Sequence, residues 1–258
     1  MGRLEAWREI GCGLGRGLLR LAVPPICPAC GCGAAEPGCC GRCRAALTHG
    51  SNARLCGRCG ASAGPHVDCS SGCFACRNDR FAFETVVRLG RYEGALMEAC
   101  RRIKEERQRP LAAALGELLW TTRAAALRQL APDAVVAVPL HWRRRWRRGY
   151  NQADEIADRL ARGLGVPRLS ALKRLRNTPP QAPLAASVRR TNVASSFRAT
   201  RRLAGARILL VDDILTTGAT CHHAARALRA AGAAQTVVAV LARGEDLGKA
   251  LTPEDSAD

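Results

Sequence analysis

Two adjacent carboxylates close an apolar stretch near residue 210, and a run of small and hydroxyl-bearing residues follows them. Asp212 and Asp213 come directly after RILLV at 207–211. After two more aliphatic residues the run consists of Thr216, Thr217, Gly218, Ala219 and Thr220. Small residues let consecutive backbone N–H groups point inward, and a helix beginning near residue 219 adds further N–H donors. This turn is therefore suited to bind a phosphate.

The acid pair indicates what would be attached to that phosphate. Asp212 and Asp213 can accept hydrogen bonds from a vicinal diol one sugar ring away from that phosphate. A phosphate turn beside a diol clamp predicts a site for ribose 5-phosphate. The turn contains no lysine and does not match G-x-x-x-x-G-K-[ST], which disfavours a Walker-type ATPase.

The second group of chemistry-bearing residues is cysteine-rich. Eleven of the fourteen cysteines fall between Cys27 and Cys76. They include four Cys-x-x-Cys pairs, and two such pairs complete a tetrahedral zinc site. The segment has few large apolar residues, and structural zinc, at about 10–16 kcal/mol apparent per site, can replace the missing core. A disulfide framework is the alternative, but it needs an oxidising compartment, and the N-terminal sequence predicts no export signal.

Sequential pairing of the cysteines predicts two Cys₄ sites, although the spacing also permits an interleaved arrangement. The first would contain Cys27, Cys30, Cys40 and Cys43, and the second Cys56, Cys59, Cys73 and Cys76. Cys39 and Cys69 are possible substitutes within these sites, and Cys32 is a spectator. The remaining cysteines, at positions 12, 100 and 221, are predicted to be small buried apolar residues.

The elements that must position these residues follow from the apolar pattern. Residues 80–92 predict a strand or hairpin edge, and 94–107 and 111–130 predict two helices separated by Pro110. AVVAVPL at 134–140 and ILLV at 208–211 are typical of strands buried on both faces. Each is followed by a loop and a helical pattern, the second helix covering 219–231, with Gly232 as its C-cap and another strand at 236–242.

Repeated alternation of strand and helix predicts an α/β fold with a parallel sheet flanked by helices. Ligands of such sheets bind at the carboxyl ends of the strands. The loops 141–152 and 212–220 would both open at that edge. His222 and His223, in the first turn of the helix at 219–231, are predicted to be exposed helix residues rather than metal ligands.

Taken together, these motifs resemble those of a known family. VDDILTTGAT at 211–220 resembles the signature of type I phosphoribosyltransferases, which bind phosphoribosyl pyrophosphate. The cysteine-rich head, RYEGAL at 91–96, VPLHWRRRWRRGYNQ at 138–152, RNTPPQ at 176–181 and RRTNVASSF at 189–197 resemble the ComF family. That family joins a double zinc ribbon to a phosphoribosyltransferase domain and is linked to natural competence and uptake of transforming DNA.

The resemblance implies roles for individual residues. Asp212 and Asp213 would engage the ribose hydroxyls as the catalytic pair, and Thr216 to Thr220 would hold the 5-phosphate. Magnesium would bridge the ribose hydroxyls and the pyrophosphate. Residues 140–150 would receive the pyrophosphate through Arg147, Arg148 and Gly149. Residues 176–197 would form a flexible loop that closes over substrate, with candidate contacts at Arg176, Thr178, Gln181, Arg190 and Asn192.

The resemblance also implies an organisation of the chain. We expect a leader helix at 1–22, a double zinc ribbon at 23–79, a phosphoribosyltransferase-like domain at 80–243 and a disordered tail at 244–258. No stretch predicts a transmembrane segment, so the expected location is the cytoplasm.

Charge and the loop at 141–152 leave the function open between two classes. The chain has 40 basic and 22 acidic residues, a net charge of +18, which fits a polyanionic partner or a compositional bias, since all but three of the basic residues are arginine. Arg and Trp interleaved in HWRRRWRRGYNQ form either a solvated basic edge or a surface that stacks on single-stranded DNA. One class is therefore a phosphoribosyltransferase whose acceptor is not identifiable. The other is a non-catalytic nucleic-acid-binding or regulatory protein that uses the zinc ribbons and the Arg/Trp loop. Single-stranded DNA and competence machinery are candidate partners.

Overall fold

The computed structural model describes residues 25–51, 54–64, 68–69, 72–74, 76–175 and 196–244 of the 258-residue chain. In chain order the elements are α2 (Gly41–Leu47), β1 (Thr85–Arg91), α3 (Gly94–Arg102), α4 (Arg109–Gln129), β2 (Ala134–Ala137), α5 (Trp142–Arg148), α6 (Gln152–Leu164), β3 (Leu172–Arg174), β4 (Phe197–Ala199), β5 (Arg207–Leu215), α8 (Ala219–Ala230) and β6 (Gln235–Arg243).

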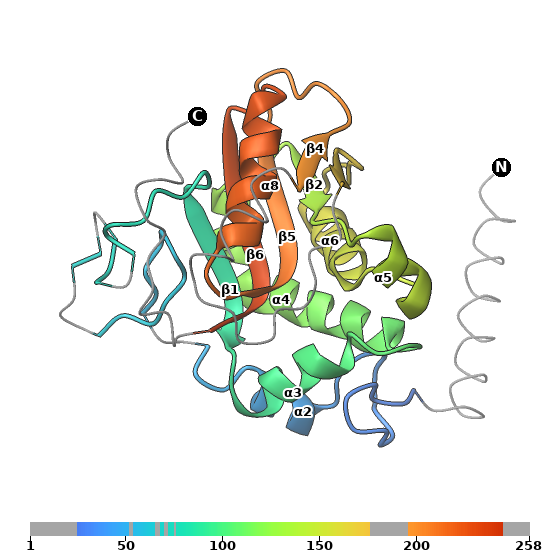
Figure 1. The fold of residues 1–258 in the computed structure, drawn as a ribbon. Helices are drawn as coiled ribbons and strands as arrows, with labels where there is room; N and C mark the ends of the chain where they lie inside the picture. The colour runs from blue at the N-terminus through green and yellow to red at the C-terminus, as the bar shows by residue number, and fades with distance from the viewer. Residues whose placement is uncertain are drawn as a thin grey trace, which may run out of the picture.

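A four-stranded parallel sheet in the order β1-β6-β5-β2 forms the centre of the fold (Figure 1). β3 and β4 form a separate antiparallel pair. The predicted α/β architecture, a parallel sheet flanked by helices, is confirmed. Because all four strands run in one direction, the ends of β2 and β5 lie at the same edge of the sheet.

Helices cover both faces of the sheet, as the apolar strands require. On one face Leu209 and Val211 of β5 share a core with α4 and α6 residues such as Leu119 and Ile156. On the other face Ile208 and Leu210 pack in a core with α8. Figure 1 shows α8 crossing in front of β5 and β6. The alternation along β5 therefore sends neighbouring side chains to opposite layers.

Three predicted helix boundaries are corrected by the structure. The helix predicted at 94–107 ends at Arg102, and turns with Arg107 at φ 59° precede α4. Pro110 lies in the first turn of α4 instead of separating two helices, because a first-turn residue needs no N–H partner. The C-cap of α8 is Ala231, with Gly232 following it at φ 93°.

The segment 141–152, predicted as a loop, is mostly helical. α5 carries no buried residue, so its apolar residues, Trp142 and Trp146, do not form the recurring core-facing stripe from which a helix is predicted. His141 accepts a hydrogen bond from the Arg143 N–H at the helix start, and Gly149 ends the helix at φ 72°. The capping residues at its two ends therefore determine where this helix begins and ends, and packing of its side chains does not.

The cysteine-rich segment contacts the sheet and α3 in two separate places. Around residues 56–60 it lies beside β1, where the Val86 N–H donates to the Gly57 carbonyl at 2.9 Å. Around residues 27–30 it lies against α3, where Arg102 donates to the carbonyls of Pro28 and Ala29. Figure 1 shows the darker blue part of this segment near α3 and the lighter part beside β1.

Among the described residues, no helix has both the length and the apolar character needed to cross a membrane. The predicted leader helix at 1–22 and all but one residue of the predicted tail lie outside the described residues.

Candidate functional site

The two acids lie at the end of β5 and face different neighbours. Asp213 is 7% exposed and accepts a hydrogen bond from Gln152 Nε2 at 3.1 Å. Lys104 Nζ lies 3.5 Å from the same Asp213 carboxylate oxygen. Asp212 instead interacts with Arg174 at the end of β3 and accepts a hydrogen bond from the Asp213 N–H at 2.9 Å. The two acids therefore meet charged groups from different layers of the fold.

The environment of Asp212 opposes its ionisation. Burial raises the pKa of Asp212 well above its ordinary value, and the neighbouring charge of Asp213 raises it further. A ligand that brings positive charge or hydroxyl donors to this carboxylate would favour its ionised form. The acid pair therefore combines a carboxyl whose ionisation is opposed with one that accepts a hydrogen bond from Gln152.

The turn after β5 has the shape of an anion site. Gly218 is the N-cap of α8 at φ 80°, a conformation that glycine adopts without strain. A Cβ at this position would lie 2.9 Å from Cε1 of Phe81, so the turn also needs glycine for space. Thr217 Oγ1 accepts from the Ala219 N–H at 3.4 Å, and Thr216, Thr217, Ala219 and Thr220 all keep some exposure. The predicted phosphate residues thus form one open turn at a helix N-terminus.

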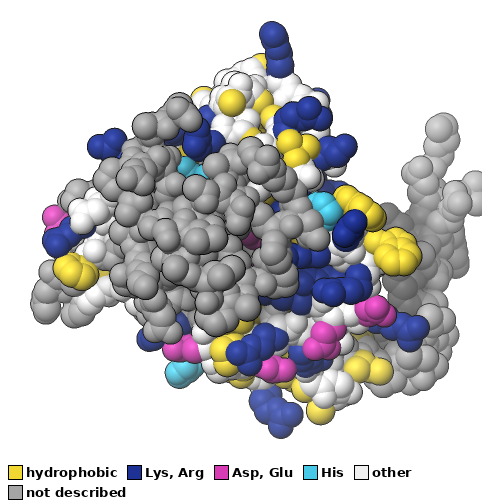
Figure 2. All heavy atoms as spheres, viewed as in Figure 1, with side chains coloured by type: hydrophobic (Ala, Val, Ile, Leu, Met, Phe, Trp, Pro, Cys, Tyr) yellow, Lys and Arg dark blue, Asp and Glu magenta, His cyan; other side chains and the backbone are white. Residues whose placement is uncertain are grey.

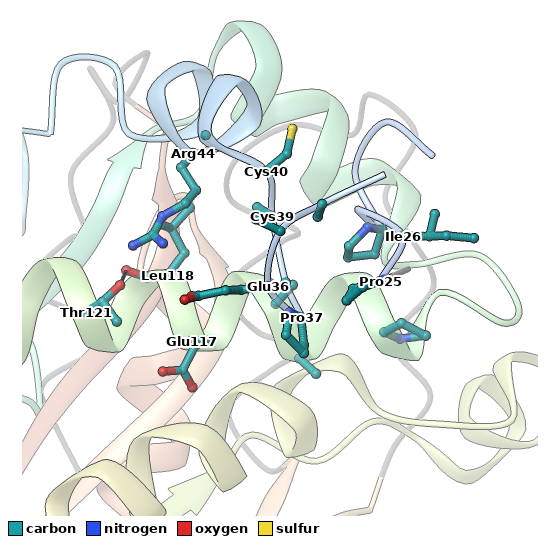
Figure 3. A pocket seen from close by; sticks show the side chains of 18 of the residues that line it. Pro25, Ile26, Glu36, Pro37, Cys39, Cys40, Arg44, Glu117, Leu118 and Thr121 are labelled. Carbon is teal, nitrogen blue, oxygen red and sulfur yellow. Dashed lines mark hydrogen bonds between the residues drawn. The ribbon is translucent and has the colours of Figure 1, made fainter. Parts of the chain in front are cut away.

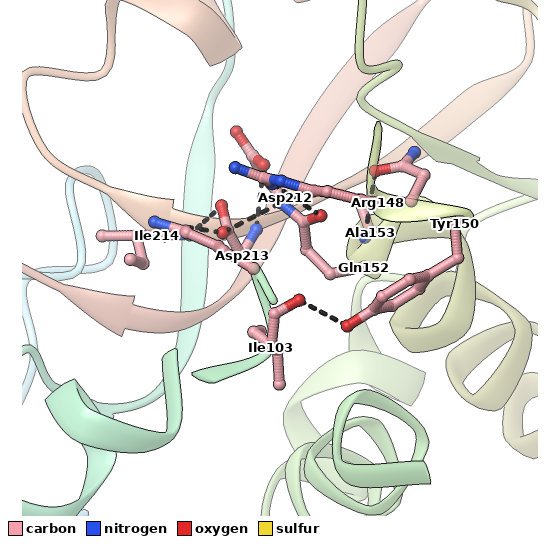
Figure 4. A network of polar contacts seen from close by, with 10 residues as sticks. Ile103, Arg148, Tyr150, Gln152, Ala153, Asp212, Asp213 and Ile214 are labelled. Atoms are coloured by element: carbon pink, nitrogen blue, oxygen red, sulfur yellow. Dashed lines mark hydrogen bonds and ion pairs between the residues drawn. The ribbon is translucent and has the colours of Figure 1, made fainter. Parts of the chain in front are cut away.

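Arg148 and Gly149 are linked to the acid pair through Gln152. Arg148 Nη1 donates to Gln152 Oε1 at 3.3 Å, and the Gln152 amide in turn donates to Asp213. Figure 4 shows this chain together with Tyr150, which donates to the Ile103 carbonyl. Arg147 is exposed and lines a cavity of about 470 Å³ with Trp146, Arg109 and Glu106.

Basic side chains gather around this edge. Figure 2 shows a dark-blue band of Lys and Arg over α5, with exposed apolar side chains at its end and acidic side chains below it towards α3. α5 itself contributes five arginines in WRRRWRR. The site edge therefore attracts anions.

The structure places most of the predicted site residues at one edge of the sheet. Asp212 and Asp213 lie in the carboxyl-terminal half of β5, and the turn 216–220 follows that strand. Arg147, Arg148 and Gly149 follow the carboxyl end of β2. Gln181 lies outside the described residues, as do the other candidate contacts at 176, 178, 190 and 192.

Two residues that contact Asp213 were not predicted. Gln152 was inside the quoted motif at 138–152 without an assigned role, and Lys104 was outside every motif. Lys104 is one of only three lysines among 40 basic residues, which was a signal that could have singled it out.

The prediction that His222 and His223 are exposed is wrong. His222 is 4% exposed and His223 is 7% exposed. His222 Nδ1 accepts from the Ala82 N–H at 3.1 Å, because the chain leaving the cysteine-rich segment crosses the first turn of α8. The two rings contact edge to face, with centroids 5.0 Å apart.

The eight Cys-x-x-Cys cysteines form two groups with sequential membership. Within each group the four Sγ atoms lie within 4.8 Å of one another. Sγ–Sγ distances include 3.6 Å for Cys59–Cys73 and 3.8 Å for Cys56–Cys76 and Cys30–Cys40. A tetrahedral site with Zn–S bonds of about 2.3 Å requires sulfurs about 3.8 Å apart. Both groups could therefore hold zinc.

Backbone donors already favour a thiolate in each group. The Cys32 N–H lowers the pKa of Cys30 to about 6, with help from Cys43. Burial raises the pKa of Cys56, but the N–H groups of Cys59, Cys73 and Arg58 outweigh it and lower the value to about 7. Such donors are the usual partners of metal-bound sulfur.

The other described cysteines lie outside both groups. Cys100 and Cys221 are 0% and 1% exposed, in agreement with the prediction that they are small core residues. Cys32 is exposed, and Cys39 and Cys69 are partly exposed.

A cavity of about 960 Å³ lies between the segment around the first group and α4. Figure 3 shows Pro25, Pro37 and Glu36 on one side and Glu117, Leu118 and Thr121 on the other. The segment around the first group therefore faces part of α4 across this cavity, while Cys39 and Cys43 pack against the core of the sheet domain.

Sequence similarity to known proteins identifies the family. Residues 108–255 match the family described as "Phosphoribosyl transferase domain". "DNA utilization protein YhgH" of Salmonella typhi is 34% identical over 230 residues, which cover 86% of this chain and 99% of that protein. The chain belongs to the ComF family.

Another relative of this chain has a name that refers to competence. "Competence protein F" of Haemophilus influenzae is 34% identical over 195 residues, 73% of this chain and 84% of that protein. Among solved structures, a purine phosphoribosyltransferase from Pyrococcus horikoshii matches at a TM-score of 0.34 and 18% identity, over 59% of this chain and 79% of that one. The ComF assignment rests on the sequence relatives and not on this likeness.

Proposed function

We propose that this ComF family protein binds phosphoribosyl pyrophosphate with Mg²⁺, or a related ribose 5-phosphate, at the edge formed by β5, α8 and α5. One observation carries the proposal: the acid pair at the end of β5 opens onto a glycine-capped turn at the N-terminus of α8. Asp212 and Asp213 would accept hydrogen bonds from the ribose hydroxyls, and the turn at 216–220 would donate N–H and hydroxyl groups to the 5-phosphate.

The pyrophosphate would lie against α5. Arg147 and Arg148 offer planar guanidinium groups, which bond phosphate oxygens two at a time. Mg²⁺ keeps much of its hydration shell, so it would enter the site with the pyrophosphate and offset the charge of that group rather than occupy a cage of protein ligands. Gln181 and its neighbours in 176–197 are proposed to close over the bound ligand.

The reaction that this site would support is displacement of pyrophosphate by a nucleophile at the ribose carbon. The acid pair would stabilise positive charge developing on the ribose, and the other residues would position the ligand. The names of the relatives, "DNA utilization protein" and "Competence protein", support a role in DNA uptake or in handling the nucleotides that result. We place this activity in the cytoplasm, and we propose that each Cys₄ group holds a structural zinc.

Calorimetry tests the proposed ligand site. Wild-type protein should bind phosphoribosyl pyrophosphate with Mg²⁺ in the micromolar range, and the double variant Asp212→Asn/Asp213→Asn should lose that binding. Asp133→Asn is the control, since this acid lies beside Arg207 at the opposite end of β5 and should bind like wild type. A folded, zinc-loaded wild type that binds none of the ligand would exclude the site.

One observation favours a second function, binding of single-stranded DNA by α5. Trp142 and Trp146 are 63% and 86% exposed, and the Arg143 guanidinium lies 5.2 Å from the centroid of the Trp142 ring. Exposed aromatic rings among arginines can stack on bases and neutralise phosphates, each stacked base contributing about 1–3 kcal/mol.

Fluorescence anisotropy with an oligothymidine tests this second function. Affinity should fall steeply between about 50 and 200 mM salt, and Trp142→Ala/Trp146→Ala should weaken it at least tenfold, as expected for about 1.4 kcal/mol or more. Phe74→Ala is the matched control, because Phe74 is 83% exposed with Arg77 over its ring but lies on the cysteine-rich segment. Loss in that variant alone would move the DNA interface away from α5.

A further inference from the structure

Arg243, the last residue of β6, joins the second Cys₄ group to the proposed phosphate turn. It is 4% exposed. Its Nε donates to the Cys59 carbonyl at 2.8 Å. Its Nη1 donates to the carbonyls of Leu215 at 3.3 Å, Gly244 at 2.8 Å and Thr216. One buried guanidinium therefore holds a zinc-ligand residue and the start of the turn together.

These hydrogen bonds determine the direction in which the backbone N–H groups of the turn point. In a trans peptide the carbonyl and the following N–H point in opposite directions. When Arg243 holds the carbonyls of Leu215 and Thr216, the N–H groups of Thr216 and Thr217 must point away from it. Those are N–H groups of the turn that would face a bound phosphate. Arg243 thus orients donors that it does not itself provide.

A second contact links the same parts of the chain. Phe81, five residues after Cys76, lies against Gly218, and the next residue donates its N–H to His222 in the first turn of α8. Phe81 also stacks on Phe83, with ring centroids 4.6 Å apart. The chain leaving the second Cys₄ group therefore covers the back of the turn, while Arg243 holds its start.

The first Cys₄ group has no such connection among the described contacts. Its segment is held by Arg102 of α3, which donates to the Ala29 carbonyl at 2.5 Å and to the Pro28 carbonyl at 3.1 Å. Arg102 and Arg243 thus perform the same kind of docking at the two groups, but only Arg243 also reaches the turn.

We propose that Arg243 is a positioning residue that makes phosphate binding at residues 216–220 depend on the second Cys₄ group and not on the first. The proposal rests on the proposed function of this turn and adds a route by which zinc loss at Cys56, Cys59, Cys73 and Cys76 lowers ligand affinity. The first group can lose its metal without disturbing the turn.

The test compares Arg243→Gln with Arg102→Gln, after zinc content and thermal unfolding have shown that each variant is folded. Affinities are measured separately for ribose 5-phosphate and for pyrophosphate with Mg²⁺. Arg243→Gln should weaken ribose 5-phosphate binding about tenfold or more, as expected for loss of charge-assisted hydrogen bonds, and change pyrophosphate binding less than about twofold. Arg102→Gln should change neither, and Arg243→Lys should recover part of the loss because it retains the charge.

Amide hydrogen exchange of the peptide containing residues 215–220 gives a readout that needs no ligand. Exchange should be faster in Arg243→Gln and in Cys73→Ser than in Arg102→Gln and Cys43→Ser. Equal exchange and equal ribose 5-phosphate affinity in the folded Arg243 variants would overturn the proposal. If the wild type binds neither ligand, the proposed function fails, and the exchange comparison still decides the role of Arg243. If Arg243→Gln does not fold, Arg243→Lys and Cys73→Ser carry the same comparison.

Discussion

Adjacent acids at the end of a strand face opposite layers, and here each has a different set of partners. Asp213 has Gln152 and Lys104 on the α4–α6 side, whereas Asp212 lies towards Arg174 on the other side. The Gln152 side chain accepts from Arg148 and donates to Asp213. The candidate ligand contacts on α5 and β5 are therefore linked by hydrogen bonds through one side chain. The ionisation of Asp212 is the feature whose energetic effect can be measured directly.

Asp212→Asn should stabilise the ligand-free protein at neutral pH. Burial raises the pKa of Asp212 above its unfolded value of about 3.9, so stability is lost as pH rises from that value through the folded pKa. Thermal unfolding should therefore show a higher Tm for the variant, by a few degrees, with a difference that grows from pH 5 to pH 8.

Asp133→Asn provides a control of opposite sign. The pKa of Asp133 is lowered because its carboxylate accepts from the Arg207 N–H at 2.8 Å and pairs with the Arg207 guanidinium. Removing this charge should lower the Tm at neutral pH, and the difference should shrink as pH falls. A Tm for Asp212→Asn at or below that of wild type at pH 8 would contradict the assigned cause.

At the scale of elements, the helices and strands that could be predicted are those whose buried apolar residues recur regularly in the sequence. The strands at 134–137 and 207–215 and the helices α6 and α8 were expected because their buried residues recur at strand or helix spacing. α5 was missed because none of its residues is buried, so its two exposed Trp rings and five arginines give no core-facing pattern. The burial of His222 was missed because it depends on a distant segment at residues 81–82, which no local pattern encodes.

The same limit applies to the candidate site. The acid pair and the turn at 216–220 are contiguous, so their motif could be read directly. Lys104 and Gln152 contact Asp213 from 109 and 61 residues away in the sequence. Arg243 contacts Leu215, at the start of the turn, from 28 residues away. No local pattern connects residues at such separations.

Packing between α4 and α6 supplies a prediction at this scale. A Cβ at Gly116 of α4 would lie 2.9 Å from the Ile156 Cα, which is backbone and cannot move aside. Gly116→Ala gains up to about 1 kcal/mol of helix propensity, but overpacking costs about 1–3 kcal/mol. Urea unfolding should show a net loss of stability. Ligand affinity per folded molecule should stay unchanged, because α4 packs behind the sheet, and a gain in stability would show that the helices separate freely.

At the scale of the whole molecule, metal and apolar burial stabilise different parts. The sheet has two extensive cores, whereas the second Cys₄ group forms a small cluster of its own with Ala61. Stability of the cysteine-rich segment should therefore follow metal occupancy, while the sheet cores depend on packing.

Elemental analysis should find two zinc ions per chain at pH 7.5. Acidification towards pH 5 should release both, since protons compete for the thiolates. Cys56→Ser should retain one zinc, whereas Cys32→Ser should retain two, because Cys32 is exposed and lies outside both groups. Two zinc ions in Cys56→Ser would show that Cys69 or another thiol replaces the missing ligand.

The two edge strands of the sheet, β1 and β2, are each hydrogen-bonded along their outer edge to a segment that is neither helix nor strand. On β2 the Val135 N–H donates to the Pro167 carbonyl at 3.0 Å, and the Val135 carbonyl accepts from the Leu169 N–H at 2.8 Å. On β1 the corresponding cover is the Gly57 carbonyl, within the Cys56–Cys59 pair. Exposed strand edges recruit strands from other molecules. Further along β1 the Arg88 carbonyl accepts from Arg123 Nε of α4 at 2.8 Å, which does not depend on metal. A metal-depleted molecule would therefore free the Val86 N–H of β1 while β2 stays covered, so its self-association should begin on one side only and yield pairs of molecules before larger aggregates.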